Sequence, residues 1–138
     1  MITQSRFREN DNRFIDGYYL KRLLSAGVTW LEHNKERVNQ LNVFPVPDGD
    51  TGTNMFLTMR SAYAAIAHMD DAHIGRITKA LAKGALIGSR GNSGTILSQL
   101  WSGVAEALDG EEKLNADLLA HSMRVAVERA YQAVEKPV

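Results

Sequence analysis

Apolar residues recur every three or four positions along most of this chain, and this spacing marks one face of an α-helix. The first stripe predicts a helix from a cap at Asp16 to about Asn39, with apolar positions at Leu20, Leu24, Val28 and Leu31. Later stripes predict helices over about 53–68, 74–87, 96–108 and 116–136. The last of these helices has Asn115 as its expected cap. No stretch shows the strict alternation of a half-buried strand.

Five helices with short connections predict an all-α bundle. We expect residues 1–13 to form a flexible polar leader and residues 14–138 to form one helical domain. Trp30 and Trp101 fall in or beside the apolar stripes and are interpreted as packing residues rather than nucleotide-stacking ones. The chain ends directly after a helix with nothing to cover that helix's far side, so we expect a fragment.

Composition excludes several classes of function. Lysine plus arginine equals aspartate plus glutamate at 16 each, which gives no electrostatic reason to expect a nucleic-acid or anionic-membrane partner. The absence of cysteine excludes disulfides, thiolate metal sites and cysteine nucleophiles, and it fits a reducing compartment. No run approaches the roughly 18 apolar residues of a membrane span, and the N-terminal residues lack the apolar core of a signal peptide. We therefore expect a cytoplasmic protein with no integral membrane segment.

The loop at 42–54 carries the densest set of oxygen ligands in the chain. Its prolines and glycines favour a stiff, tightly turning backbone. It presents two carboxylates, Asp48 and Asp50, followed by hydroxyls at Thr51 and Thr53 and an amide at Asn54. Hard oxygen ligands of this kind suit Mg²⁺, which keeps waters and phosphates as further ligands. The alternative is an ordinary turn capped by its own carboxylates.

A second glycine-rich loop covers residues 88–94 and leads into the predicted helix at 96–108. Free N–H groups and the helix dipole favour an anion at such a helix start. Backbone and side-chain contacts are expected from Ser89, Gly91, Asn92, Ser93 and Gly94. The loop has no Gly-Lys-Ser/Thr and is not a Walker loop, and a simple serine–glycine helix cap remains the alternative.

The two loops complement each other chemically. A carboxylate pair repels a bare phosphate, and a helix N-terminus repels a bare metal ion, whereas a magnesium–nucleotide complex satisfies both. Phosphoryl transfer needs little beyond this positioning and charge neutralisation. The pair of loops therefore indicates a kinase-like or ATPase-like site on a helical scaffold.

The segments 42–55 and 88–99 resemble the ATP-binding domain of the dihydroxyacetone-kinase superfamily. The likeness runs from about Phe14 to the end of the chain and is closest to the N-terminal domain of bacterial fatty acid kinase, the partner of DegV-like fatty-acid-binding proteins. It implies an antiparallel barrel of amphipathic helices that holds ATP and Mg²⁺ at one end. Because domains of this family continue with further helices, we expect a barrel truncated at its C-terminus, with exposed apolar helix faces that are open to self-association. The likeness also implies that Asp48 and Asp50 are magnesium ligands with a catalytic role, and that the nucleotide-binding residues include Thr51, Gly52, Thr53, Asn54, Asn92 and Ser93.

One departure from the superfamily bears on the acceptor. Dihydroxyacetone kinases have a third aspartate where this chain has Val43, and the neighbouring Asn42 is a neutral candidate for the third metal ligand. This departure favours the fatty acid kinase branch, in which a fatty acid carboxylate, delivered by the DegV-like partner, becomes an acyl phosphate. The alternatives are a dihydroxyacetone-type (glycerone) kinase nucleotide subunit and a catalytically silent nucleotide-binding or interaction module. We expect the chain alone to be inactive as a kinase.

Overall fold

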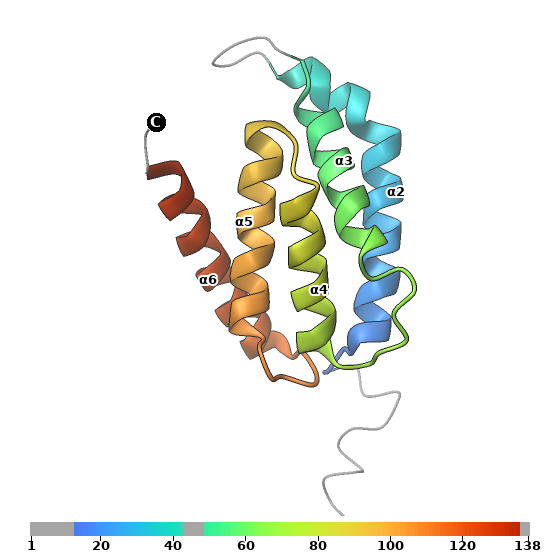
Figure 1. Ribbon diagram of the computed structural model, residues 1–138, viewed down its shortest axis with the longest axis vertical. Helices are drawn as coiled ribbons and strands as arrows, with labels where there is room; N and C mark the ends of the chain where they lie inside the picture. The colour runs from blue at the N-terminus through green and yellow to red at the C-terminus, as the bar shows by residue number, and fades with distance from the viewer. Residues whose placement is uncertain (1–12, 43–48, 136–138) are drawn as a thin grey trace, which may run out of the picture.

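The computed structural model describes residues 13–42 and 49–135, and it confirms the all-α prediction for them (Figure 1). Its five helices are α2 (Gly17–Leu41), α3 (Thr51–Ala64), α4 (Ile74–Ile87), α5 (Gly91–Ala107) and α6 (Ala116–Glu135). Within these residues no strand forms. A single antiparallel bridge joins Ile15 to Leu114 and ties the start of α2 to the connection before α6.

Consecutive helices run antiparallel and pack side by side, as Figure 1 shows. Helix α3 also contacts α5, and α2 also contacts α4, so the row is curved and its core lies between α2, α3 and α4. Between the described parts of α2 and α6 there is no contact, and these two helices form the open edges of the bundle. The starts of α3 and α5 lie at the same end as the C-terminal ends of α2 and α4, here called the loop end.

Side-chain caps explain where two helices begin. The Asp16 carboxylate accepts the N–H of Tyr19 at 2.9 Å, and Asn115 Oδ1 accepts the N–H of Leu118 at 2.8 Å. Both caps were predicted and are confirmed. Helices α3 and α5 begin at Thr51 and Gly91, earlier than the starts at about 53 and 96 that their apolar stripes predicted.

The two tryptophans behave differently. Trp101 packs against the main core, and its indole N–H lies 3.2 Å from the sulfur of Met59, as expected for a packing residue. Trp30 is 63% exposed, so its interpretation as a packing residue was wrong. The physical reason is that α2 is an edge helix, with neighbours on one side alone in the described part of the chain.

Helix α6 carries a stripe of large exposed apolar residues, which are Leu119, Met123, Val127, Tyr131 and Val134. It packs against α5 on one side, where the glycine at position 103 lets the two backbones approach closely. Self-association through the exposed stripe stays a prediction. None of the described helices is long and apolar enough to cross a membrane.

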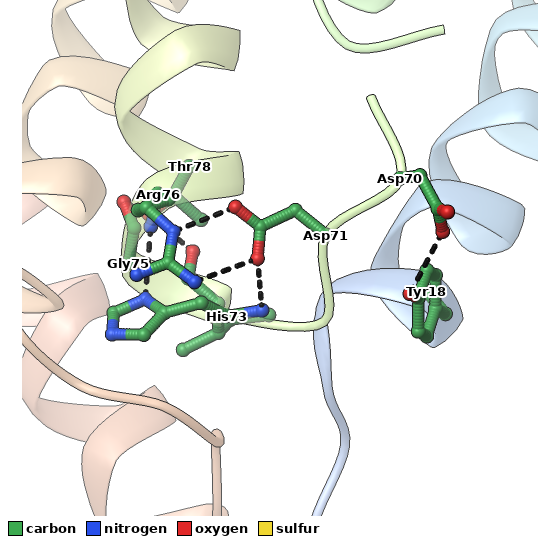
Figure 2. Close-up of polar contacts among 8 residues, drawn as sticks. Tyr18, Asp70, Asp71, His73, Gly75, Arg76 and Thr78 are labelled. Atoms are coloured by element: carbon green, nitrogen blue, oxygen red, sulfur yellow. Dashed lines mark hydrogen bonds and ion pairs between the residues drawn. The ribbon is translucent and has the colours of Figure 1, made fainter. Parts of the chain in front are cut away.

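The connection between α3 and α4, at the end of the bundle away from the loops, is fixed by carboxylates (Figure 2). Tyr18 donates its hydroxyl to Asp70 at 2.8 Å. Asp71 accepts the guanidinium of Arg76 at 2.6 and 2.9 Å and the N–H of His73 at 2.9 Å. These contacts join the start of α2 to the first turn of α4.

The close approach of α5 and α6 generates a first prediction. A Cβ at Gly103 would lie 2.6 Å from the Cα of Ala126, whereas a Cβ at Gly27, on the exposed side of α2, would meet nothing within 4 Å. Gly103→Ala should therefore lower the free energy of unfolding by about 1–3 kcal/mol through overpacking. The matched Gly27→Ala should raise it by about 0.5–1 kcal/mol, because alanine favours the helix. Urea denaturation tests both, and the same response at the two positions would contradict this packing.

The ion pair of Figure 2 generates a second prediction. The Arg76 guanidinium, and then the N–H of His73, lower the pKa of the Asp71 carboxyl from 3.8 to about 2. Because the unfolded chain then binds more protons, the stabilisation is present above pH 3.8 and is lost as the pH falls through about 2. NMR titration should detect the low pKa, and Arg76→Gln should raise it towards the ordinary value. An unchanged pKa in Arg76→Gln would show that the ion pair does not form in solution.

Candidate functional site

The start of α3 is capped by two asparagines from the end of α2. Asn42 Oδ1 accepts the N–H groups of Asp50 at 3.1 Å and Thr51 at 3.3 Å. Asn39 makes a two-way pair with Thr53: its Oδ1 accepts the Thr53 N–H at 3.0 Å, and its side-chain amide donates to the Thr53 hydroxyl at 2.9 Å. Amides that a helix start normally leaves free are therefore satisfied within the protein.

Gly52 lies between these capped residues and is buried. A Cβ at this position would overlap the backbone of Lys35 in α2. Glycine is therefore required here for helix packing, because α2 passes close to the first turn of α3. Its predicted phosphate contact stays a prediction.

The start of α5 contrasts with that of α3. Its N-cap residue, Arg90, makes no side-chain capping bond, and the first helical bond runs from the N–H of Gly94 to the carbonyl of Arg90 at 3.0 Å. The N–H groups of Gly91, Asn92 and Ser93 therefore precede the helical hydrogen-bond ladder. They lie at the positive end of a 17-residue helix dipole. This start is the part of the loop end best suited to an anion.

One side of α3 brings the two helix starts together. The side-chain amide of Asn54 lies directly against Gly91, whose φ of +66° favours glycine. Two helical turns further on, the Ser61 hydroxyl donates to the carbonyl of Gly84 at 3.1 Å and packs on Gly88. The predicted juxtaposition of the two loops is thus present in the described residues.

Thr58 lies between Asn54 and Ser61 on the same side of α3. Its hydroxyl donates to the carbonyl of Asn54 at 2.8 Å and accepts the N–H of Arg90 at 3.1 Å. Sequence reasoning missed Asn39, Thr58 and Ser61. The signal available for the last two was a run of polar residues at helical spacing, 54, 58 and 61, on one side of a helix.

Asp50 is exposed and makes no capping bond through its carboxylate. Its carbonyl accepts the N–H of Asn54 at 2.9 Å, so the carboxylate stands one helical turn before the residue that touches Gly91. Asp48 lies outside the described residues. Among the residues that the structure describes, no three histidine, cysteine or acidic side chains cluster into a metal site. The chemistry fits Mg²⁺, which needs one or two carboxylates and completes its shell with phosphates and water.

The remaining predicted residues have individual roles in the structure. The oxygen of Asn42 is engaged by two backbone amides, so its predicted metal contact competes with its cap. The Thr53 hydroxyl accepts from Asn39, and the Ser89 hydroxyl donates to the carbonyl of Leu86 at 3.3 Å. Thr51, Asn92 and Ser93 are at least partly exposed at the loop end.

One hollow of the described surface, of about 470 Å³, is lined by Phe14, Ile15, Leu114 and Leu119. It lies beside the start of α6 and away from the loop end, so it does not belong to the candidate site formed by the two helix starts.

Comparison with known proteins shows which family this chain resembles. A family model described as the DAK2 domain matches residues 45–138. Protein YloV of Bacillus subtilis (strain 168) is 46% identical over 126 residues, which are 91% of this chain and 23% of that protein. An uncharacterized protein of Staphylococcus aureus (strain USA300) is 46% identical over 124 residues, which are 90% of this chain and 23% of that protein. The chain thus spans less than a quarter of the length of these relatives.

The capping of α3 generates a third prediction. Asn42→Ala removes the acceptor of two amides and should lower the free energy of unfolding by about 1 kcal/mol, whereas Asn42→Asp keeps an acceptor and should not destabilise the chain. Thermal unfolding in a chelator measures the cap without any metal. Gln40→Ala, an exposed neighbour on α2, is the matched control. If Asn42→Ala left stability unchanged in chelator but weakened Mg²⁺ binding, the residue would be a metal ligand rather than a cap.

Proposed function

Because this chain belongs to the DAK2 domain family of the dihydroxyacetone-kinase superfamily, we propose that its loop end binds Mg²⁺–ATP for phosphoryl transfer. The family supports a nucleotide-binding domain of the kinase type. ATP, magnesium and the reaction itself are parts of the proposal. The proposal includes a cytoplasmic location, because ATP is available there. A chain without cysteine forms no disulfides and therefore does not need an oxidising compartment.

A single observation supports this function best: the uncapped start of α5 lies against Asn54, one turn from the carboxylate of Asp50. The amides of Gly91, Asn92 and Ser93 offer donors for phosphate oxygens. Asp50, with Asp48 beside it in sequence, offers the acidic ligands. A nucleotide phosphate chain with its metal ion is a ligand that needs both kinds of group at once.

The roles of these residues follow from their chemistry. The α5 amides and the side chain of Asn92 bind and orient the phosphates, while Asp48 and Asp50 hold the magnesium ion. When bound, magnesium supplies neutralisation of phosphate charge. The residues of this chain then need to position the γ-phosphoryl group for attack by an acceptor oxygen, with ADP as the leaving group.

For the acceptor we propose a fatty acid carboxylate presented by a DegV-like binding protein. Such a carboxylate is ionised near neutral pH and needs no general base to attack. Support comes from the sequence, in which Val43 replaces the third aspartate of dihydroxyacetone kinases. Formation of acyl phosphate with such a partner, without turnover of dihydroxyacetone, would distinguish this acceptor from the alternative.

The metal role of Asp50 generates a fourth prediction. Because the exposed Asp50 carboxylate makes no capping bond, Asp50→Asn should leave the fold intact, and by removing the charge it should weaken magnesium-dependent ATP binding by about tenfold or more. Calorimetric titration of ATP, with and without Mg²⁺, measures the effect. Asp109→Asn, an exposed aspartate at the far end of α5, is the matched control. Equal affinity in Asp50→Asn and the unaltered chain would refute the metal role.

A further inference from the structure

Thr58 is a fully buried hydroxyl side chain whose contacts link two helices, α3 and α5. Its one proton goes to the carbonyl of Asn54 in its own helix, at 2.8 Å. This leaves the oxygen lone pairs to accept, and one of them receives the N–H of Arg90 at 3.1 Å. The hydroxyl therefore links the body of α3 to the N-cap residue of α5.

Gly94 brings the next turn of α5 against the same hydroxyl. A Cβ at Gly94 would overlap Thr58 Oγ1, so glycine is what allows this close approach. The backbone of α5 is thus held at Arg90 by a hydrogen bond and at Gly94 by contact, both with Thr58. The three open amides of Gly91, Asn92 and Ser93 lie between these two points.

We propose that Thr58 is a positioning residue for the nucleotide site, acting through the α5 amides without touching the ligand. This inference rests on the proposed function. A helix start binds an anion well when its N–H groups are held in a fixed direction before the ligand arrives, since no reorganisation is then needed. Thr58 supplies that fixation from the helix that also carries Asp50 and Asn54. It therefore sets the metal-binding and phosphate-binding parts of the site relative to each other.

Thr78 provides the comparison that separates positioning from ordinary packing. It is also fully buried and also a threonine that bonds to its own helix, with its hydroxyl 2.9 Å from the carbonyl of Ile74 and 3.2 Å from that of Gly75. Both acceptors belong to the first turn of α4, at the end of the bundle away from the loops. Loss of the Thr78 hydroxyl should disturb stability without affecting the start of α5.

The test is a titration of Mg²⁺–ATP into the chain, followed by backbone amide NMR, for four proteins: unaltered, Thr58→Val, Thr58→Ser and Thr78→Val. Valine matches the shape of threonine and leaves the Arg90 N–H without its acceptor. We expect Thr58→Val to weaken binding by about tenfold and to speed solvent exchange of the Arg90 amide. Thr58→Ser should restore both, and Thr78→Val should bind like the unaltered chain. If Thr58→Val does not fold, Thr58→Ala and Thr78→Ala make the same comparison.

Each other outcome overturns the inference in a recognisable way. Equal affinity of the unaltered chain and Thr58→Val would remove the positioning role and leave the proposed function standing. Equal weakening in Thr58→Ser or in Thr78→Val would show that the hydroxyl contact is not the cause. Absence of binding and of shifts at Gly91, Asn92 and Ser93 in the unaltered chain would overturn the proposed function, and the positioning role with it.

Discussion

The arrangement of the loop end depends on close contact between polar side chains of α3 and glycines that surround the start of α5. Asn54 lies on Gly91, Thr58 lies on Gly94, and Ser61 lies on Gly88. Each contact needs a residue without a Cβ on one side and a short polar group on the other. Because the polar residues repeat at helical spacing, the contact continues along α3 and fixes the direction in which α5 leaves the turn. Whatever the two loops bind, their relative position is set here.

The same contact explains why the two helix starts differ. The C-terminal turns of α2 lie close enough to α3 for Asn39 and Asn42 to cap it, and this closeness requires a glycine at position 52. Among the described residues no side chain caps α5 in this way, and its start faces α3 through Thr58, which accepts the amide of Arg90. One start is therefore capped by neighbouring side chains and carries the acidic residue Asp50, while the first three amides of the other precede the helical hydrogen-bond ladder. In the proposed function this difference assigns the metal ion to the first start and the phosphates to the second.

The spacing of apolar residues predicted most of the helices, because a helix that buries one face places an apolar residue there every three or four positions. It was reliable where a capping side chain sits next to the stripe, as at Asp16 and Asn115. It failed where contacts with other parts of the chain determine where a helix begins or whether a side chain is buried. The stripes predicted the starts of α3 and α5 a few residues too late, since neither first turn is apolar and both are stabilised by residues from outside the helix. Trp30 shows the converse error: a position beside an apolar stripe is exposed when its helix stands at an edge.

The sequence predicted which residues make up the candidate site, and these assignments stay predictions, whereas the structure adds packing and capping roles that the sequence did not indicate. Glycines, hydroxyls and carboxylates at the two loops indicated a phosphate and a metal ion, but sequence cannot distinguish a glycine that admits a ligand from one that admits a neighbouring helix. In the described structure Gly52 is of the second kind, because the backbone of Lys35 occupies the space of its Cβ. Gly91 and Gly94 also admit α3 side chains, and of these two glycines Gly91 alone has an amide that precedes the helical hydrogen-bond ladder, because the N–H of Gly94 bonds to the carbonyl of Arg90. A glycine-rich motif of this kind can therefore be required by helix packing at the same positions where the proposed function needs contacts with a ligand.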